Sequence, residues 1–293
     1  MSPFFRSIVP RLRLFGLIVA AGVVLASCGP SKQGAGQAHP YDRAKDAFKT
    51  GDLDKALDLT DKLATATPPA DYTERARVLR VVIYTGQLKG AKELAEAYSK
   101  GAEKAEASQT RSGYRSLQHD VMVTAAKAAL NLAGTAHQIA PDGVIAKELT
   151  LEASYPTTEG PPEIKELATV EEGRWIEADQ QDSALVDALR RGVDDALADV
   201  VSGDRAKARQ ALASGSTKLE GAAFAIFLAQ QLAEGAVVCH HSLDPQRLRM
   251  LCDEGDETLK AALALLQDTP NKDQQKEVKK LQDRFKTIRK SIE

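Results

Sequence analysis

The chain has 293 residues, long enough for one large domain or two ordinary ones, and it carries 39 Lys+Arg against 41 Asp+Glu. This balance argues against nucleic-acid binding, because nucleic-acid-binding proteins usually carry a strong basic excess. Aromatic residues make up only 5% of the chain, and alanine and leucine dominate its apolar residues. That composition favours packed helices over sheets. The three cysteines are too few for a scaffold built from disulfides.

The first residues have the features of an export signal. Arg6, Arg11 and Arg13 precede an uncharged apolar run, Leu14 to Ser27, and residues 1–27 contain no acidic residue. As a helix this run would be about 21 Å long, too short for a hydrocarbon core of ~30 Å. A positive start, a short apolar stretch and small residues at its end together predict a signal peptide over residues 1–27.

The end of this run, Leu25-Ala26-Ser27-Cys28-Gly29, resembles the lipobox of bacterial lipoproteins. The resemblance implies that the signal is cut before Cys28, that Cys28 is acylated, and that the protein is lipid-anchored in the bacterial cell envelope. Gly29 in place of Asp implies the outer membrane, facing the periplasm. An ordinary signal peptide that contains a cysteine and an uncut anchor are the alternatives. Residues 28–40 hold no apolar cluster and are expected to form a flexible tether.

The remaining chain is predicted to be all-α. Alternating β-branched runs typical of strands do not occur, whereas apolar residues recur at helical spacing in two clear stripes. These stripes are Tyr114, Leu117, Val121, Ala125, Ala128, Leu132 and Ile139, and then Leu185, Leu189, Val193, Leu197 and Val200. The apolar and uncharged run Gly221 to Ala233 has only 13 residues and predicts a buried helix rather than a membrane span.

Proline marks several expected boundaries. Asp244-Pro245 and Thr269-Pro270 each place a capping side chain before a proline, which predicts the start of a helix. The stretch from Pro156 to Pro162 is expected to separate a helical domain over residues 41–155 from a second helical region over 163–293.

A weak internal repeat aligns Thr50–Leu59 with Thr85–Leu94, so that Thr, Gly, Leu, Ala and Leu coincide. Gly51 and Gly86 are therefore expected to form left-handed turns between helices, and Gly203 is a third instance. The pattern resembles the tetratricopeptide repeat (TPR), over about residues 41–100. The resemblance implies antiparallel helical hairpins stacked as a short TPR-like α-solenoid, which the second region continues. A generic helical hairpin with a glycine turn is the alternative.

The sequence contains few residues or motifs that indicate catalysis or metal binding. No nucleotide-binding, hydrolase or metalloprotease motif occurs, so no catalytic residue, cofactor or enzymatic activity is predicted. If Cys28 carries the lipid, Cys239 and Cys252 are the two cysteines that remain, and they lie in an oxidising compartment. This predicts a disulfide between them. Two free buried thiols are an alternative, and a metal site that includes His240 and His241 is another.

Three surface features have more than one interpretation. Residues 159–199 carry twelve acidic against four basic residues, which fits either a solvated helix face or an attraction for a basic partner. Trp175, within that stretch, is either an anchor for a partner or a core residue. The apolar stripe of the last segment predicts a helix that caps the body, with a coiled-coil arm or a patch on anionic lipid as alternatives. Its members are Val278, Leu281, Phe285, Ile288 and Ile292.

A lipid anchor joined to stacked helices predicts a scaffold or adaptor of the cell envelope, which binds unidentified envelope proteins through a helical-repeat groove. It would contact the membrane through the lipid on Cys28 and bind no nucleic acid. The alternative is a ligand-binding accessory lipoprotein of a transport system. An open groove would favour the adaptor, and an enclosed apolar pocket would favour ligand binding.

Overall fold

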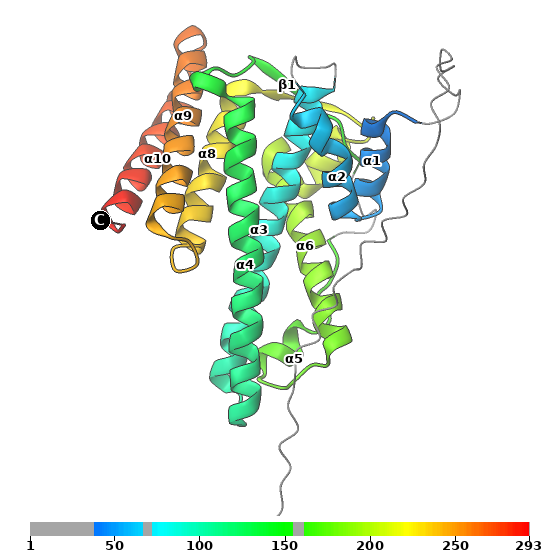
Figure 1. Ribbon diagram of the computed structural model, residues 1–293. Coiled ribbons are helices and arrows are strands. Elements are labelled where there is room, and N and C mark those ends of the chain that lie inside the picture. Colours follow the sequence, from blue (N-terminus) through cyan, green and yellow to red (C-terminus); the bar gives the residue numbers. More distant parts are fainter. Residues whose placement is uncertain (1–37, 67–71, 155–160, 293) are drawn as a thin grey trace, which may run out of the picture. The chain divides into compact units, whose positions relative to one another are not determined.

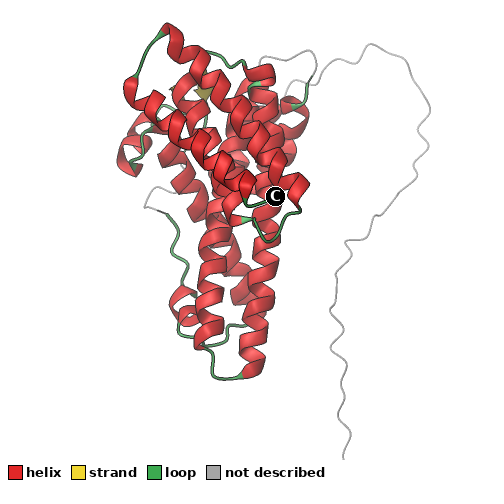
Figure 2. Cartoon of the chain, turned by 90° about the vertical axis from the view of Figure 1, so that its left-hand side faces the viewer, coloured by secondary structure: helices red, strands yellow, loops and turns green. Residues whose placement is uncertain are grey.

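The computed structural model describes residues 38–66, 72–154 and 161–292. Ala38–Glu293 form a single unit, and its described residues are mostly helical with only two short strands, which confirms the all-α prediction (Figures 1 and 2). The helices and strands are, in chain order, α1 (Pro40–Lys49), α2 (Leu53–Ala64), α3 (Thr73–Lys104), α4 (Ser108–Ile139), the 3-10 turn η1 (Pro141–Gly143), β1 (Glu148–Leu151), α5 (Leu167–Glu171), α6 (Ala178–Val201), α7 (Arg205–Ala211), β2 (Thr217–Glu220), α8 (Gly221–Val238), α9 (Pro245–Asp268) and α10 (Lys272–Lys290).

A long hairpin of α3 and α4 lies at the centre of the fold (Figure 1). Each helix has 32 residues, and the link of three residues between them, 105–107, makes α4 return along α3. The predicted stripe of α4 is the face that packs inward, with Tyr114, Val121 and Leu132 buried. The periodicity in this segment therefore predicted both the helix and its buried face.

The other helices cover the two sides of this hairpin. In Figure 1, α2 and α6 pack on α3, with α1 against α2, whereas α8 and α9 pack on α4 and α10 covers α8 and α9. A linear solenoid would stack each hairpin only on the one before it. Here α6 returns to α3 and α8 returns to α4, so the arrangement is a bundle about a central hairpin.

The two expected helical regions do not have separate hydrophobic cores. Residues of 41–155 and of 163–293 share one hydrophobic cluster, and both regions belong to the same unit. The stretch from Pro156 to Pro162, most of which lies outside the described residues, therefore joins two parts of one packed body.

The backbones of α3 and α6 come almost into contact where they cross. A Cβ atom added to Gly192 of α6 would lie 2.0 Å from the carbonyl oxygen of Gly86, and one added to Gly90 would lie 2.1 Å from that of Ala188. No side chain fits at these positions. The expectation of a turn at Gly86 is wrong, because this glycine lies inside α3 and serves to admit α6.

Two other glycine turns are confirmed. Gly51 has φ 74° and Gly203 has φ 71°, the left-handed conformation that glycine adopts without steric cost. In each case an aspartate follows and caps the next helix: the carboxylate of Asp52 accepts from the backbone of Lys55, and that of Asp204 from the backbone of Lys207.

The proline boundaries have different outcomes. Asp244 caps α9, accepting from the backbone N–H of Arg247 at 2.9 Å, and Pro245 is its first residue, as predicted. The expected start at Thr269-Pro270 is wrong by two residues, since Asn271 is the cap of α10 and accepts from two backbone N–H groups.

A short antiparallel sheet was not predicted. β1 and β2 pair over four residues each, with Leu149 opposite Leu219 and both side chains buried. A strand of four residues is too short to show an alternating pattern, so the sequence carried no usable signal for it.

Helices α8 and α10 fit their predictions. By length and composition α8 is a candidate membrane span among the described helices, yet 72% of it is buried inside the body. Four members of the apolar stripe, Val278, Leu281, Phe285 and Ile288, are buried in α10 against α8 and α9, and the ring of Phe285 lies over Gly255. The fifth, Ile292, follows the helix and is partly buried. This confirms the capping helix; a coiled-coil arm or a lipid patch would need the stripe exposed.

We predict that Gly192→Ala lowers the free energy of unfolding by about 3 kcal/mol, because the new methyl group would overlap the backbone of α3. Urea unfolding measures this. Gly134→Ala is the matched control: Gly134 is exposed on α4 with nothing near its added Cβ, so this variant should gain up to about 1 kcal/mol. Equal stability of Gly192→Ala and the unaltered chain would contradict the close crossing.

Candidate functional site

The predicted lipidation residue, Cys28, lies outside the described residues, as do the signal peptide and most of the tether. The end of the tether is described. His39 caps α1 by accepting from the backbone of Tyr41, and Pro40 is the first residue of the helix. The folded body therefore begins at the predicted end of the tether.

The start of the body is fastened to α3 through Glu152. Its carboxylate forms ion pairs with Lys45 of α1 and, at 2.7 Å, with Arg75 of α3. Its backbone carbonyl accepts from the hydroxyl of Tyr41 at 3.1 Å. Tyr41 is fully buried, and this burial raises the pKa of its hydroxyl. The chain therefore leaves the body from a fixed point.

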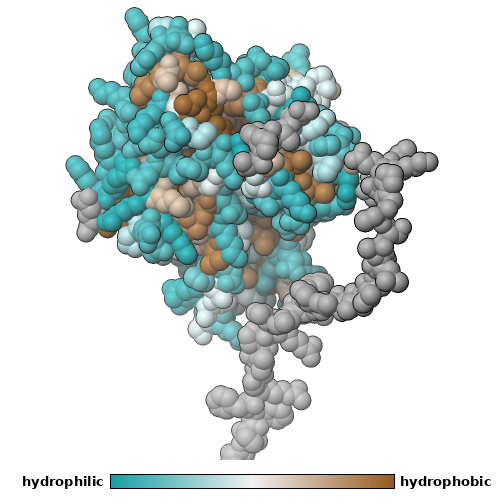
Figure 3. Space-filling view, turned by 45° about the horizontal axis from the view of Figure 1, so that its top comes forward, coloured by the Kyte–Doolittle hydropathy of each residue, from teal (hydrophilic) through white to brown (hydrophobic). Residues whose placement is uncertain are grey.

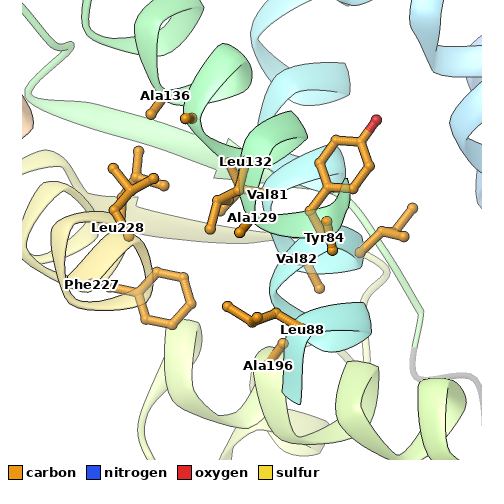
Figure 4. Close-up of a cluster of buried hydrophobic side chains, with 14 of the residues drawn as sticks. Val81, Val82, Tyr84, Leu88, Ala129, Leu132, Ala136, Ala196, Phe227 and Leu228 are labelled. Atoms are coloured by element: carbon orange, nitrogen blue, oxygen red, sulfur yellow. The ribbon is translucent and has the colours of Figure 1, made fainter. Parts of the chain in front are cut away.

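A hollow of about 350 Å³ opens between α3, α6 and α8, and we call it the three-helix hollow. Its lining is mostly charged or polar. The lining residues are Leu88, Lys89, Lys92, Glu93 and Glu96 of α3, Asp195 and Asp199 of α6, and Gln230, Gln231 and Glu234 of α8. Leu88 forms the apolar floor of the hollow. Figure 4 shows that Leu88 of α3, Ala196 of α6 and Phe227 of α8 converge there.

Ion pairs hold the walls of the three-helix hollow together. Lys89 of α3 pairs with Asp199 of α6 at 2.5 Å, and Lys92 pairs with Glu234 of α8 at 2.7 Å. Glu234 also accepts from Arg284 of α10 at 2.8 Å. Burial works against ionisation of Glu234, but the hydrogen bonds from Lys92 and Arg284 outweigh it and lower the pKa of this carboxyl group. Glu234 thus joins three helices at one carboxylate.

A second hollow, of about 470 Å³, lies between α2, α3 and α4. Arg80 and Tyr84 of α3 line it, and the guanidinium of Arg80 donates to the Tyr84 hydroxyl at 2.8 Å and pairs with Asp61 of α2 at 3.2 Å. Burial raises the pKa of Tyr84. Like the three-helix hollow, it is open to solvent and polar in lining.

Trp175 is half-exposed and packs against the body on one side. Its side chain is 44% exposed, its ring lies 5.3 Å from that of Tyr114, and it covers Gly113 of α4. Packing on one side thus holds the indole in place while the other side faces solvent. A fixed and half-exposed indole is a suitable contact for a partner.

The predicted disulfide is not formed. Cys239 ends α8 and Cys252 lies in α9; both are fully buried free thiols, which corrects the prediction and agrees with one of its alternatives. Burial raises the pKa of Cys239 to about 12 and that of Cys252 to about 11. They pack as small apolar side chains. Within the described residues, no three His, Cys, Asp or Glu side chains form a group that could hold a metal ion.

The acidic stretch is partly neutralised inside the chain. Asp195 pairs with Arg205, Asp199 with Lys89, and the fully buried Asp194 lies 3.8 Å from Arg209. The basic face of α10 instead pairs with acidic residues of α8 and α9. These pairs are Arg284 with Glu234, and Arg289 with Asp253 and Asp256.

Large apolar side chains that are exposed are few among the described residues and come from different elements. They are Val123, Val144, Trp175, Val186, Val237 and Met250. Figure 3 shows one face of the protein, where hydrophilic residues predominate and apolar residues form separate areas.

No protein-family model, curated protein or solved structure matches this chain.

We predict that Glu234→Gln lowers the free energy of unfolding by about 2 kcal/mol at neutral pH. The pKa of Glu234 is lower in the folded than in the unfolded chain. Its stabilising contribution is therefore present above the unfolded-chain pKa and is lost as the pH falls through the folded pKa. Denaturation across this pH range should show the two chains converging towards acid, and a difference that does not vary with pH would argue against the ion pairs. Glu103→Gln, exposed on α3, is the control and should change little.

We also predict that the thiols of Cys239 and Cys252 react with Ellman's reagent only after unfolding, because burial keeps them protonated and covered. The assay uses a Cys28→Ser variant, so that only these two of the three cysteines remain. Two thiols should be counted in denaturant without reductant. A count of zero there, restored by reductant, would mean that a disulfide forms.

Proposed function

We propose that this chain is a lipid-anchored scaffold or adaptor of the bacterial cell envelope, which binds other proteins through its helical surface. The observation that carries the proposal is the lipobox-like segment that ends at Cys28, followed by a helical body that begins near residue 40. A flexible segment of n residues has a root-mean-square end-to-end distance of ~5–6 Å × √n. The short segment between Cys28 and the body would therefore keep the body close to the membrane without inserting it.

The form of the hollows supports an adaptor over a ligand carrier. Both hollows described above open to solvent and have largely polar linings. An accessory lipoprotein that carries an apolar ligand would need an enclosed apolar cavity. Protein partners, in contrast, bind at open surfaces that combine polar rims with a few aromatic anchors, such as the half-exposed Trp175.

The proposal assigns no enzymatic activity. The buried thiols are poor nucleophiles because their pKa values are raised. Four of the five carboxylates that line the three-helix hollow already form ion pairs within the chain. A scaffold requires neither group to react.

We predict that Cys28→Ala moves the protein from the membrane pellet to the soluble fraction of the envelope, because the acyl acceptor is removed. Fractionation of cells followed by immunoblotting measures this. Cys252→Ala serves as the control and should remain in the pellet. A Cys28→Ala protein that stays with the membrane would contradict lipid anchoring.

We further predict that affinity capture from detergent-solubilised envelopes recovers one reproducible partner protein, and that Trp175→Ala reduces its recovery at least about tenfold. Val237→Ala removes an exposed apolar side chain of α8 instead and should leave recovery unchanged. Recovery of a single chain with a bound small molecule would favour the ligand-binding alternative over the adaptor.

A further inference from the structure

Gln231 is the side chain of the three-helix hollow that the ion pairs do not explain. Only 5% of this residue is exposed, and its side chain lines the hollow. Its side-chain amide forms no hydrogen bond with another residue in the part of the chain that the structure describes. The amide atoms of Gln231 are not among the buried polar atoms without a partner, so the amide still reaches the water in the hollow and can exchange that water for a ligand group. The residue is therefore suited to a polar group that enters the hollow from outside.

The charges around Gln231 favour a positive group. Five carboxylates and two ammonium groups line the hollow. Lys89, Lys92, Arg191, Arg205 and Arg284 form ion pairs with four of these carboxylates. The fifth is that of Glu96, which is exposed and has no ion pair among the described residues, so its charge is left to attract a cation.

The size of the hollow limits what can enter. Its volume of about 350 Å³ is near the lower end of the range for ligand sites. The floor at Leu88 is apolar and continues into the packed cluster of Figure 4. A hydrocarbon stem fits against this floor while its charged end faces the carboxylates. The carboxylates do not gather closely enough to hold a metal ion among the described residues.

We propose that the three-helix hollow binds an alkyl-ammonium or alkyl-guanidinium group, whose stem lies on Leu88 and whose charged end lies among the carboxylates and donates to the amide oxygen of Gln231. This site goes beyond the proposed function and does not depend on the lipid anchor. The group can belong to a lysine or arginine side chain of a partner protein, or to a free polyamine.

The experiment follows the side-chain amide signal of Gln231 by ¹H–¹⁵N NMR of the purified full chain in detergent. The signal is assigned by its absence from the Gln231→Leu variant. The probes are spermidine, the capped tripeptide acetyl-Gly-Arg-Gly-amide and, as a matched anionic control, acetyl-Gly-Glu-Gly-amide. The Gln231 signal should shift with a cationic probe and not with the anionic one. A shift with the arginine peptide alone indicates a partner side chain, and a shift with spermidine alone indicates a free polyamine.

A second variant keeps the test independent of any folding defect in Gln231→Leu. Glu96→Gln changes only an exposed charge at the rim and should weaken binding of the cationic probe about threefold. Glu103→Gln removes an exposed charge on the same helix outside the hollow and should leave binding unchanged. The proposal is overturned if neither cation shifts the signal, if the anionic peptide shifts it equally, or if Glu96→Gln binds as tightly as the unaltered chain. Partner capture is measured separately, so failure here would leave the adaptor proposal standing.

Discussion

The rest of the body depends on the contact between the backbones of α3 and α6. Gly86 and Gly90 on one helix, and Gly192 on the other, leave no room for a side chain between them. Close contact of this kind brings many backbone atoms within van der Waals range, where their small individual attractions add up. It also fixes where Asp195 and Asp199 of α6 stand relative to the lysines of α3. The three-helix hollow therefore exists because two helices approach more closely than side chains allow.

Ion pairs then set the position of the helices on the far side. Glu234 of α8 accepts from Lys92 of α3 and from Arg284 of α10, and Arg289 of α10 pairs with two aspartates of α9. Partly buried pairs of this kind penalise any arrangement that leaves a charge buried alone. They therefore specify which faces of α8, α9 and α10 meet, in addition to what they add to stability.

Features that repeat along the chain were predictable from the sequence, and features that depend on one contact were not. The helices around Tyr114 and Phe285 carry apolar stripes at helical spacing, and both were predicted with the correct buried face. Gly86 was assigned to a turn because a glycine that opens a turn and one that admits a neighbouring helix look alike in sequence. Pairing of Cys239 with Cys252 depends on a separation in space that residue spacing does not determine. Gln231 gave no signal, since a lone amide becomes significant only when its surroundings bury it.

The attachment of the N-terminal helix has a mechanical consequence. Any pull on the residues before His39 reaches the body first through α1, whose Tyr41 and Lys45 are both bonded to Glu152. Glu152 passes the load through Arg75 to the central hairpin and, one residue upstream, to the strand that ends at Leu151. These contacts must break together before α1 can detach, so tension on the residues before His39 would be resisted by the core of the protein rather than by its outermost helix.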